Sequence, residues 1–152
     1  MEPINWFMTV VTQHYFDFNG RARRAEFWWY TLVYVIADVA LYVIESILHV
    51  GTLLTSLYGL ALLLPGLGVS VRRLHDTDRT GWLVLIPCVP GLLWSVLSFG
   101  ALASGSLGGF LILTSLLGVA TLLAAAYLVY LLAQPGTSGS NQYGTDPKAG
   151  LT

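Results

Sequence analysis

Charged residues are scarce in this sequence. Asp, Glu, Lys and Arg together make up 10% of its 152 residues, whereas an average soluble domain contains about 25%. Hydrophobic residues make up 55%, so there is too little polar surface to cover a soluble globule. Soluble enzymes and basic nucleic-acid binders are therefore disfavoured, and no nucleic-acid partner is expected. A small integral membrane protein is the class that remains.

Cysteine and the common cofactor motifs are also nearly absent. The single cysteine, Cys88, cannot form an internal disulfide. The sequence contains no P-loop, no complete dinucleotide-binding glycine fingerprint and no HExxH motif. His14 and His49 are isolated from other metal-ligating residues. No metal site and no cofactor are therefore expected.

Long apolar runs are abundant, and a membrane-spanning helix needs about 20 mostly apolar residues. Four runs qualify, at residues 27–50, 53–71, 81–99 and 110–132. The predicted fold is all-α and integral to the membrane, with four transmembrane helices, an interfacial amphipathic helix before them and a flexible tail after them. The expected division is residues 1–26 for the interfacial helix and arginine-rich turn, 27–132 for the four-helix domain and 133–152 for the Gly/Ser-rich tail.

Residues 3–18 have helical periodicity but are too short and too polar to cross a bilayer. Their apolar and aromatic face is formed by Trp6, Phe7, Val10, Val11, His14, Tyr15 and Phe18. This pattern predicts a helix lying in the plane of the membrane interface, ended by a turn at Asn19 and Gly20. The aromatic run at residues 27–30 is typical of an anchor at headgroup depth.

Arginine is distributed very unevenly. All six arginines lie either just before the first predicted span or between the second and third, whereas residues 49–52 and 100–109 contain no Lys or Arg. With four spans, these basic residues all fall on one side of the membrane. The positive-inside rule places that side, and both termini, in the cytoplasm of a bacterial inner membrane.

Prolines interrupt two of the predicted spans. Pro87 and Pro90 lie in the third span, and Pro65 lies in the second. Proline removes a backbone donor, so it kinks a helix unless neighbouring groups satisfy the freed carbonyls. Packing geometry is the simpler interpretation, and a gating hinge is the alternative. In the fourth span, Ala120 and Ala124 have the spacing that permits close contact between helices.

A polar stripe follows one face of the first span. At 100° per residue its side chains project within about 80° of one another; they are Tyr34, Asp38, Tyr42, Glu45 and His49. A charge at the bilayer centre costs about 2.5–3.5 kcal/mol on insertion scales, so this stripe is expected to face protein or a water-filled cavity. We expect Asp38 to be neutral and hydrogen-bonded to Tyr34 or Tyr42. The stripe serves either a proton or cation pathway or a buried polar network that fixes helix register.

A second polar cluster combines the two arginine-rich segments. Guanidinium groups match phosphate and carboxylate geometry, so these segments form a candidate site for an anionic lipid headgroup. The alternative is that the arginines fix topology and form internal salt bridges. His75 beside Asp76 offers a base and an orienting group in principle, although adjacent side chains usually point apart. The candidate residues are Arg21, Arg23, Arg24, Glu26, Arg72, Arg73, His75, Asp76 and Arg79.

Three segments resemble a known bacterial membrane family, catalogued as domain of unknown function 805. They are residues 16–29 (FDFNGRARRAEFWW), residues 71–82 (VRRLHDTDRTGW) and residues 136–147 (GTSGSNQYGTDP). The resemblance implies a multi-span inner-membrane protein and brings no established activity. It also implies that the three motifs belong together, with the tail folding back onto the arginine-rich segments. That adds Asn141, Tyr143 and Asp146 to the candidate ligand-binding residues.

Three functional classes remain open at this stage. The first is a non-enzymatic membrane component whose arginine-rich face engages anionic lipid headgroups or a partner protein. The second is a proton- or ion-coupled transport element built on Asp38 and Glu45; because four spans form a thin bundle, this role would require several copies. The third is a membrane enzyme acting on a phosphorylated lipid through His75 and Asp76. Membrane lipids, a second copy of the chain and another membrane protein are the expected partners.

Overall fold

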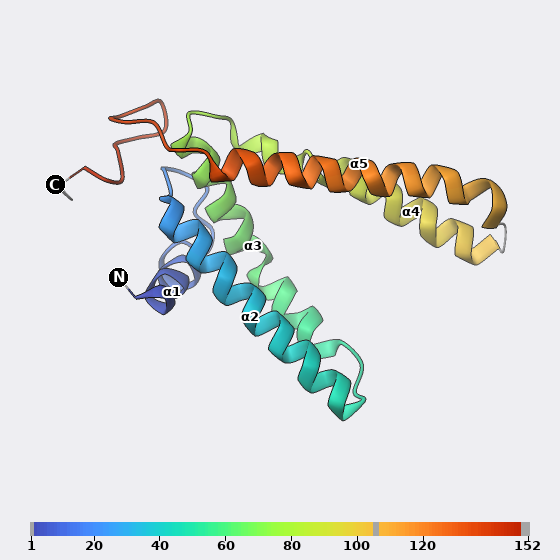
Figure 1. Ribbon diagram of the computed structural model, residues 1–152. Helices are drawn as coiled ribbons and strands as arrows, with labels where there is room; N and C mark the ends of the chain where they lie inside the picture. Colours follow the sequence, from blue (N-terminus) through green and yellow to red (C-terminus); the bar gives the residue numbers. More distant parts are fainter. Residues whose placement is uncertain (1, 105–106, 150–152) are drawn as a thin grey trace. The chain divides into compact units, whose positions relative to one another are not determined.

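The computed structural model describes residues 2–104 and 107–149, and its regular elements are helices (Figure 1). The elements are α1 (Pro3–Gln13), α2 (Arg24–Leu48), α3 (Leu53–Asp76), the 3-10 helix η1 (Gly81–Leu85), α4 (Cys88–Ser104) and α5 (Leu107–Ala133). The chain divides into two compact units. Unit 1 contains the chain up to Gly81 together with the tail from Pro135, and unit 2 contains Trp82–Gln134.

Four helical segments are long and apolar enough to cross a membrane, as predicted. They are Arg24–Leu48, Leu53–Asp76, Gly81–Ala103 and Leu111–Ala133. The first begins three residues before the predicted span and the second continues five residues beyond it, because helical hydrogen bonding extends into the polar flanks. Helix α4 likewise continues into the predicted connection 100–109, of which residues 105–106 lie outside the described residues.

The third predicted span is not one continuous α-helix. It begins with the 3-10 turn Gly81–Leu85, and α4 starts only at Cys88. Pro87 and Pro90 lack the N–H groups that a continuous helix would need at these positions. In unit 2, α4 then packs against α5. The two helices approach closely where a Cβ on Gly91 would lie 3.5 Å from the Thr121 methyl group.

Helix α1 packs on α2 and α3 with the face that its periodicity predicts. Val10 is fully buried, and the Phe7 ring stacks on Tyr30 at a centroid distance of 5.5 Å. The helix ends at Gln13 rather than near Asn19. A local turn stops it earlier, because the Asp17 amide donates to the His14 carbonyl and the two side chains pair at 2.8 Å. Its location at a membrane interface stays a prediction.

Pro65 lies inside α3, and hydroxyl groups from neighbouring segments satisfy the carbonyls around it. The Ala61 carbonyl, four residues earlier, cannot receive a hydrogen bond from Pro65. The Tyr15 hydroxyl donates to this carbonyl at 2.5 Å, and the Tyr30 hydroxyl donates to the adjacent Leu62 carbonyl at 3.0 Å. The helix therefore passes through the proline without leaving that carbonyl unpaired.

Candidate functional site

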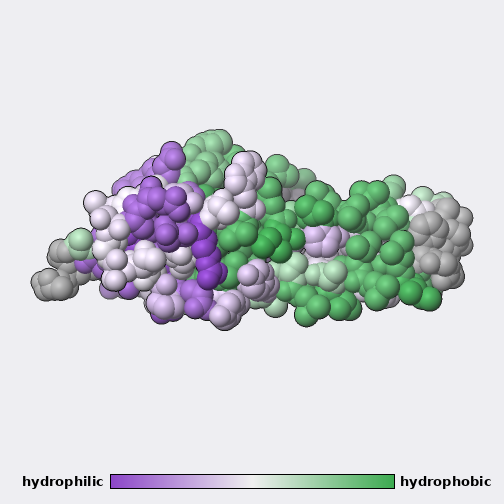
Figure 2. Space-filling view, turned by 90° about the horizontal axis from the view of Figure 1, so that it is seen from above, coloured by the Kyte–Doolittle hydropathy of each residue, from purple (hydrophilic) through white to green (hydrophobic). Residues whose placement is uncertain are grey.

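The two arginine-rich segments meet in unit 1, beside the tail. The segment before α2 lies along the end of α3, where the Ala22 amide donates to the Arg72 carbonyl at 3.0 Å. Hydrophilic surface gathers over this end of unit 1, whereas the surface of α4 and α5 is mainly hydrophobic (Figure 2). The convergence implied by the three motifs is therefore present in the structure.

Asp76 is the centre of this cluster, and it is 3% exposed. Its Oδ1 atom pairs with the Arg21 guanidinium at 2.9 Å, and its Oδ2 atom pairs with Arg73. A Cβ atom on Gly136 would overlap with the same carboxylate. Glycine is therefore required where the tail passes Asp76.

The tail is held by both backbone and side-chain bonds. Arg21 Nη1 donates to the Gly139 carbonyl and Arg21 Nη2 to the Thr137 carbonyl, each at 2.6 Å. The Thr137 amide in turn donates to the Asp76 carbonyl at 2.8 Å. Asn141 Nδ2 donates to the His75 carbonyl at 2.9 Å. These bonds hold the Gly/Ser-rich segment against α3.

His75 is enclosed by the same tail. Its ring stacks on Tyr143 with a centroid distance of 3.8 Å and an interplanar angle of 3°. Its Nδ1 atom lies 3.2 Å from the Gly20 carbonyl. The neighbouring Asp76 side chain instead faces Arg21 and Arg73. Among the described residues, no bond joins the His75 imidazole to the Asp76 carboxylate.

Asp146 stabilises the turn within the tail. The amides of Lys148 and Gly139 donate to its two carboxylate oxygens at 2.9 Å and 3.1 Å. These bonds hold the pKa of Asp146 below its ordinary value, with Arg21 adding to the effect. Asn141 and Gly144 pair through their backbones in the same turn. Asn141, Tyr143 and Asp146, the candidate residues of the tail, thus stabilise its turn and attach it to α3.

Arg72 forms a second buried pair, with Glu26. Its Nη1 atom lies 2.7 Å from Glu26 Oε1, and Arg72 is only 3% exposed. Its Nε and Nη2 atoms have no hydrogen-bond partner among the described residues. Its charge also acts on Asp17: burial alone raises the pKa of Asp17, but bonds from His14 and Asn19, together with Arg72, lower it.

The six arginines consequently fall into two groups. Arg21, Arg72 and Arg73 are buried and paired with carboxylates inside the protein. Arg23 and Arg79 are half-buried, and Arg24 is exposed. The candidate site therefore combines three buried, paired arginines with three that are more accessible. A ligand-binding role for any of these residues stays a prediction.

The polar stripe of α2 is divided by the structure. Glu45 is buried and binds the start of α3, because its carboxylate accepts bonds from the Leu54 amide, the Thr55 amide and the Thr55 hydroxyl. His49 ends α2 in a left-handed conformation and is exposed. Tyr42 is exposed as well.

Asp38 does not make the hydrogen bond that we expected. It is half-buried and has no hydrogen bond to Tyr34, Tyr42 or any other described residue. Tyr34 instead stacks on Tyr58 of α3 at 5.4 Å, and the Tyr58 hydroxyl donates to the Tyr34 carbonyl.

Two parts of the site were not expected from the sequence. The Thr137 backbone amide links the tail to the Asp76 carbonyl. In the sequence, the only signal for this contact was the position of Thr137 directly after Pro135 and Gly136. Tyr15 was assigned to the apolar face of the first helix, whereas its hydroxyl caps Ala61. The available signal was Pro65, which lies four residues after Ala61 and has no N–H to donate to its carbonyl.

In the described part of the chain, no group of three or more His, Cys, Asp and Glu is arranged to hold a metal ion.

Comparisons with known proteins give matches over most of the chain. The family described as "Protein of unknown function (DUF805)" matches residues 15–145. Inner membrane protein YhaI of Escherichia coli K12 is 37% identical over 97% of this chain and 98% of its own length. Inner membrane protein YhaH of the same strain is 30% identical over 95% and 98%. The uncharacterized protein YiiR is 30% identical over 90% of each chain. No solved structure matches.

Proposed function

The chain belongs to the family "Protein of unknown function (DUF805)", and from this premise we propose that it is a non-catalytic inner-membrane component that binds anionic lipid headgroups. The binding residues are Arg23 and Arg24 at the start of α2. The arginine-bearing end of unit 1, with both termini, lies on the cytoplasmic side. The named relatives are inner membrane proteins, and the positive-inside rule supports the orientation.

This proposal depends on the difference between the three buried arginines and those that are more accessible. Arg21, Arg72 and Arg73 are buried and paired with Asp76 and Glu26 inside the protein, so they are poorly accessible to an external phosphate. Arg23 and Arg24 lie at the start of a helix long and apolar enough to cross the bilayer. One turn further, Trp28 is 41% exposed and Trp29 is 37% exposed. Tryptophan beside arginine at a helix end is typical of the headgroup region, where guanidinium groups pair with lipid phosphates.

The geometry gives less support to the other functional classes. An enzyme using His75 and Asp76 would need the two side chains to act together, but His75 stacks on Tyr143 while Asp76 binds arginine. A transport element would need Asp38 and Glu45 to pass protons or cations between them. The Glu45 carboxylate is instead engaged by the first backbone amides of α3, which leaves Asp38 as the single candidate of the pair.

Lipid retention tests the headgroup proposal. Native mass spectrometry of the full chain, extracted from membranes containing phosphatidylglycerol and phosphatidylethanolamine, should show preferential retention of phosphatidylglycerol. Arg23→Gln and Arg24→Gln should each reduce this retention, because each removes one phosphate-pairing cation. Lys148→Gln removes the same charge from the exposed tail and serves as the matched control. Equal retention of the two lipids by the unmodified protein would refute the proposal.

Cysteine labelling tests the orientation. In a Cys88→Ala background, Thr52→Cys places a thiol at the turn between α2 and α3, and Gln142→Cys places one in the exposed tail. A membrane-impermeant maleimide applied to spheroplasts should label the first variant and spare the second. Permeabilised cells, in which both should react, provide the control. The reverse pattern would place the arginines outside the cytoplasm.

A further inference from the structure

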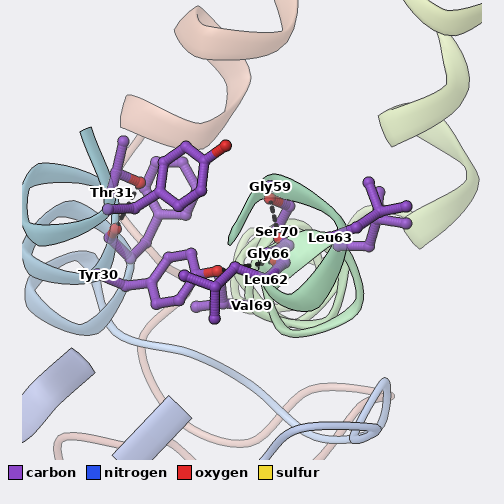
Figure 3. A pocket seen from close by; sticks show the side chains of 11 residues that line it. Tyr30, Thr31, Gly59, Leu62, Leu63, Gly66, Val69 and Ser70 are labelled. Atoms are coloured by element: carbon purple, nitrogen blue, oxygen red, sulfur yellow. Dashed lines mark hydrogen bonds between the residues drawn. The ribbon is translucent and has the colours of Figure 1, made fainter. Parts of the chain in front are cut away.

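Helices α2 and α3 enclose a groove of about 340 Å³ within unit 1 (Figure 3). In this view Thr31 of α2 and Leu63 of α3 stand on opposite sides, with Gly59 and Ser70 between them. Within the unit the groove is open, since Leu63 at its edge is 56% exposed. Both of its walls belong to helices that are long and apolar enough to cross a membrane.

Glycine makes this groove hollow. A Cβ atom on Gly59 would meet only the Tyr34 hydroxyl, at 3.7 Å. A Cβ atom on Gly66 would lie 3.3 Å from the Tyr30 hydroxyl. A larger side chain at Gly59 would therefore extend into the groove.

Three of the four hydroxyl groups that line the groove are engaged within the protein, and only the Tyr34 hydroxyl has no hydrogen bond to the described residues. Thr31 donates to the Phe27 carbonyl at 2.8 Å, Ser70 to the Gly66 carbonyl at 2.7 Å and Tyr30 to the Leu62 carbonyl at 3.0 Å. A polar ligand would find these donors occupied. The groove therefore suits hydrocarbon, which requires no hydrogen-bond partners.

The groove-lining face of α2 leads toward half-buried Arg23 and exposed Arg24. Phe27, Tyr30, Thr31 and Tyr34 recur at helical spacing. Continuing that face by one turn toward the start of the helix reaches Arg23 and Arg24. The distance from Phe27 to Tyr34 is about 10 Å along the helix at 1.5 Å per residue. That length fits within one leaflet, which is half of a hydrocarbon core about 30 Å thick.

We propose that one anionic glycerophospholipid occupies this site, with an acyl chain in the α2–α3 groove and its phosphate against Arg23 and Arg24. This inference rests on the proposed headgroup-binding function and adds the position of the chain. Charge complementarity selects an anionic lipid, because the groove-lining face of α2, continued by one turn, reaches Arg23 and Arg24. Buried acyl surface contributes binding free energy in addition to the ion pair.

Photocrosslinking in lipid bilayers tests the position of the chain. The full-length protein is reconstituted in phosphatidylethanolamine vesicles with a trace of phosphatidylglycerol that carries a diazirine on one acyl chain. A phosphatidylethanolamine probe with the same chain is compared in parallel, and mass spectrometry locates the adducts. The phosphatidylglycerol probe should label Thr31 and Leu63 more strongly than the phosphatidylethanolamine probe. The exposed Ile36 and Leu60 should show no such preference.

Filling the groove provides the decisive variant. Gly59→Leu should reduce phosphatidylglycerol labelling of Thr31 and Leu63 by about tenfold, because it displaces several methylenes of the chain. Leucine is also a better helix former than glycine, so α3 should remain folded. Gly100→Leu is the matched control, since a Cβ there would meet nothing within 4 Å.

The possible outcomes separate the two proposals. If phosphatidylglycerol is retained through Arg23 and Arg24 but the groove is labelled equally by both probes, or not at all, the groove inference is wrong and the headgroup proposal stands. If retention itself shows no preference for phosphatidylglycerol, both proposals fail. A photoreactive amino acid placed at position 63 that cross-links two copies of the chain, with no lipid adducts in the groove, would identify a second copy as the occupant and overturn the inference.

Discussion

The guanidinium group of Arg21 lies 2.9 Å from the carboxylate of Asp76, although 55 positions separate the two residues. Arg73 pairs with the other oxygen of the same carboxylate. Through its backbone carbonyl, Asp76 also accepts a bond from the tail residue Thr137. One buried residue thus joins the segment before α2, the end of α3 and the tail, through its side chain and its backbone carbonyl together.

Replacing Asp76 by asparagine should therefore destabilise unit 1 strongly. The variant removes the carboxylate that Arg21 and Arg73 share in the protein interior, and breaking a buried pair in this way costs about 3–5 kcal/mol. Thermal unfolding of the purified protein in detergent should show a clearly lower midpoint. Asp78→Asn is the control, because Asp78 is exposed and has a left-handed conformation that asparagine tolerates. Equal midpoints for the two variants would contradict this assignment.

Gly136 offers a milder way to displace the tail. Gly136→Ala places a methyl group in overlap with the Asp76 carboxylate, and overpacking of this kind costs about 1–3 kcal/mol. The tail should move away, and the Thr137 amide should lose its protection in hydrogen exchange. Gly100→Ala controls for the substitution itself. Unchanged protection at Thr137 would mean that the tail does not depend on this close approach.

Acidification should loosen the turn within the tail. The pKa of Asp146 is held below its ordinary value of 3.8 by amide bonds from Lys148 and Gly139. Because the folded-state pKa is lowered, the stabilisation is fully present above pH 3.8 and is lost as the pH falls through the folded value. Exchange of the Gly139 and Lys148 amides, corrected for intrinsic rates, should accelerate only below that pH. Asp146→Asn should remove this pH dependence, and a transition near neutral pH would assign the effect to another group.

Hydropathy and motif spacing predicted much of this architecture. The four apolar runs gave the spans, and the three motifs indicated that distant segments meet at one end. The sequence could not distinguish the buried arginines from the exposed ones, because Arg72 pairs with Glu26 of α2, the adjacent Arg73 pairs with Asp76 of its own helix, and the burial of both depends on the segments packed around them. It also placed Glu45 in a polar stripe. Its actual partners, Leu54 and Thr55, are defined only once the turn between α2 and α3 is formed.

Tyr15 and Pro65 should be energetically coupled. Pro65 leaves the Ala61 carbonyl without its helical donor, and the Tyr15 hydroxyl replaces that donor at 2.5 Å. Tyr15→Phe should therefore lower the unfolding free energy by about 0.5–1.5 kcal/mol, or more because the carbonyl is left unpaired. Pro65→Ala restores a backbone N–H that can bind the same carbonyl.

A double-mutant cycle isolates this coupling from the packing that each substitution also changes. Tyr15→Phe should cost less in the Pro65→Ala background than in the natural one, because the helix then supplies its own hydrogen bond to Ala61. Denaturant titration of the four proteins in one detergent measures the difference. A Tyr30→Phe cycle with Pro65→Ala provides the comparison, since Tyr30 binds the carbonyl of Leu62, whose helical donor is Gly66. If the cost of Tyr15→Phe is the same in both backgrounds, the hydroxyl does not substitute for the donor missing at Pro65.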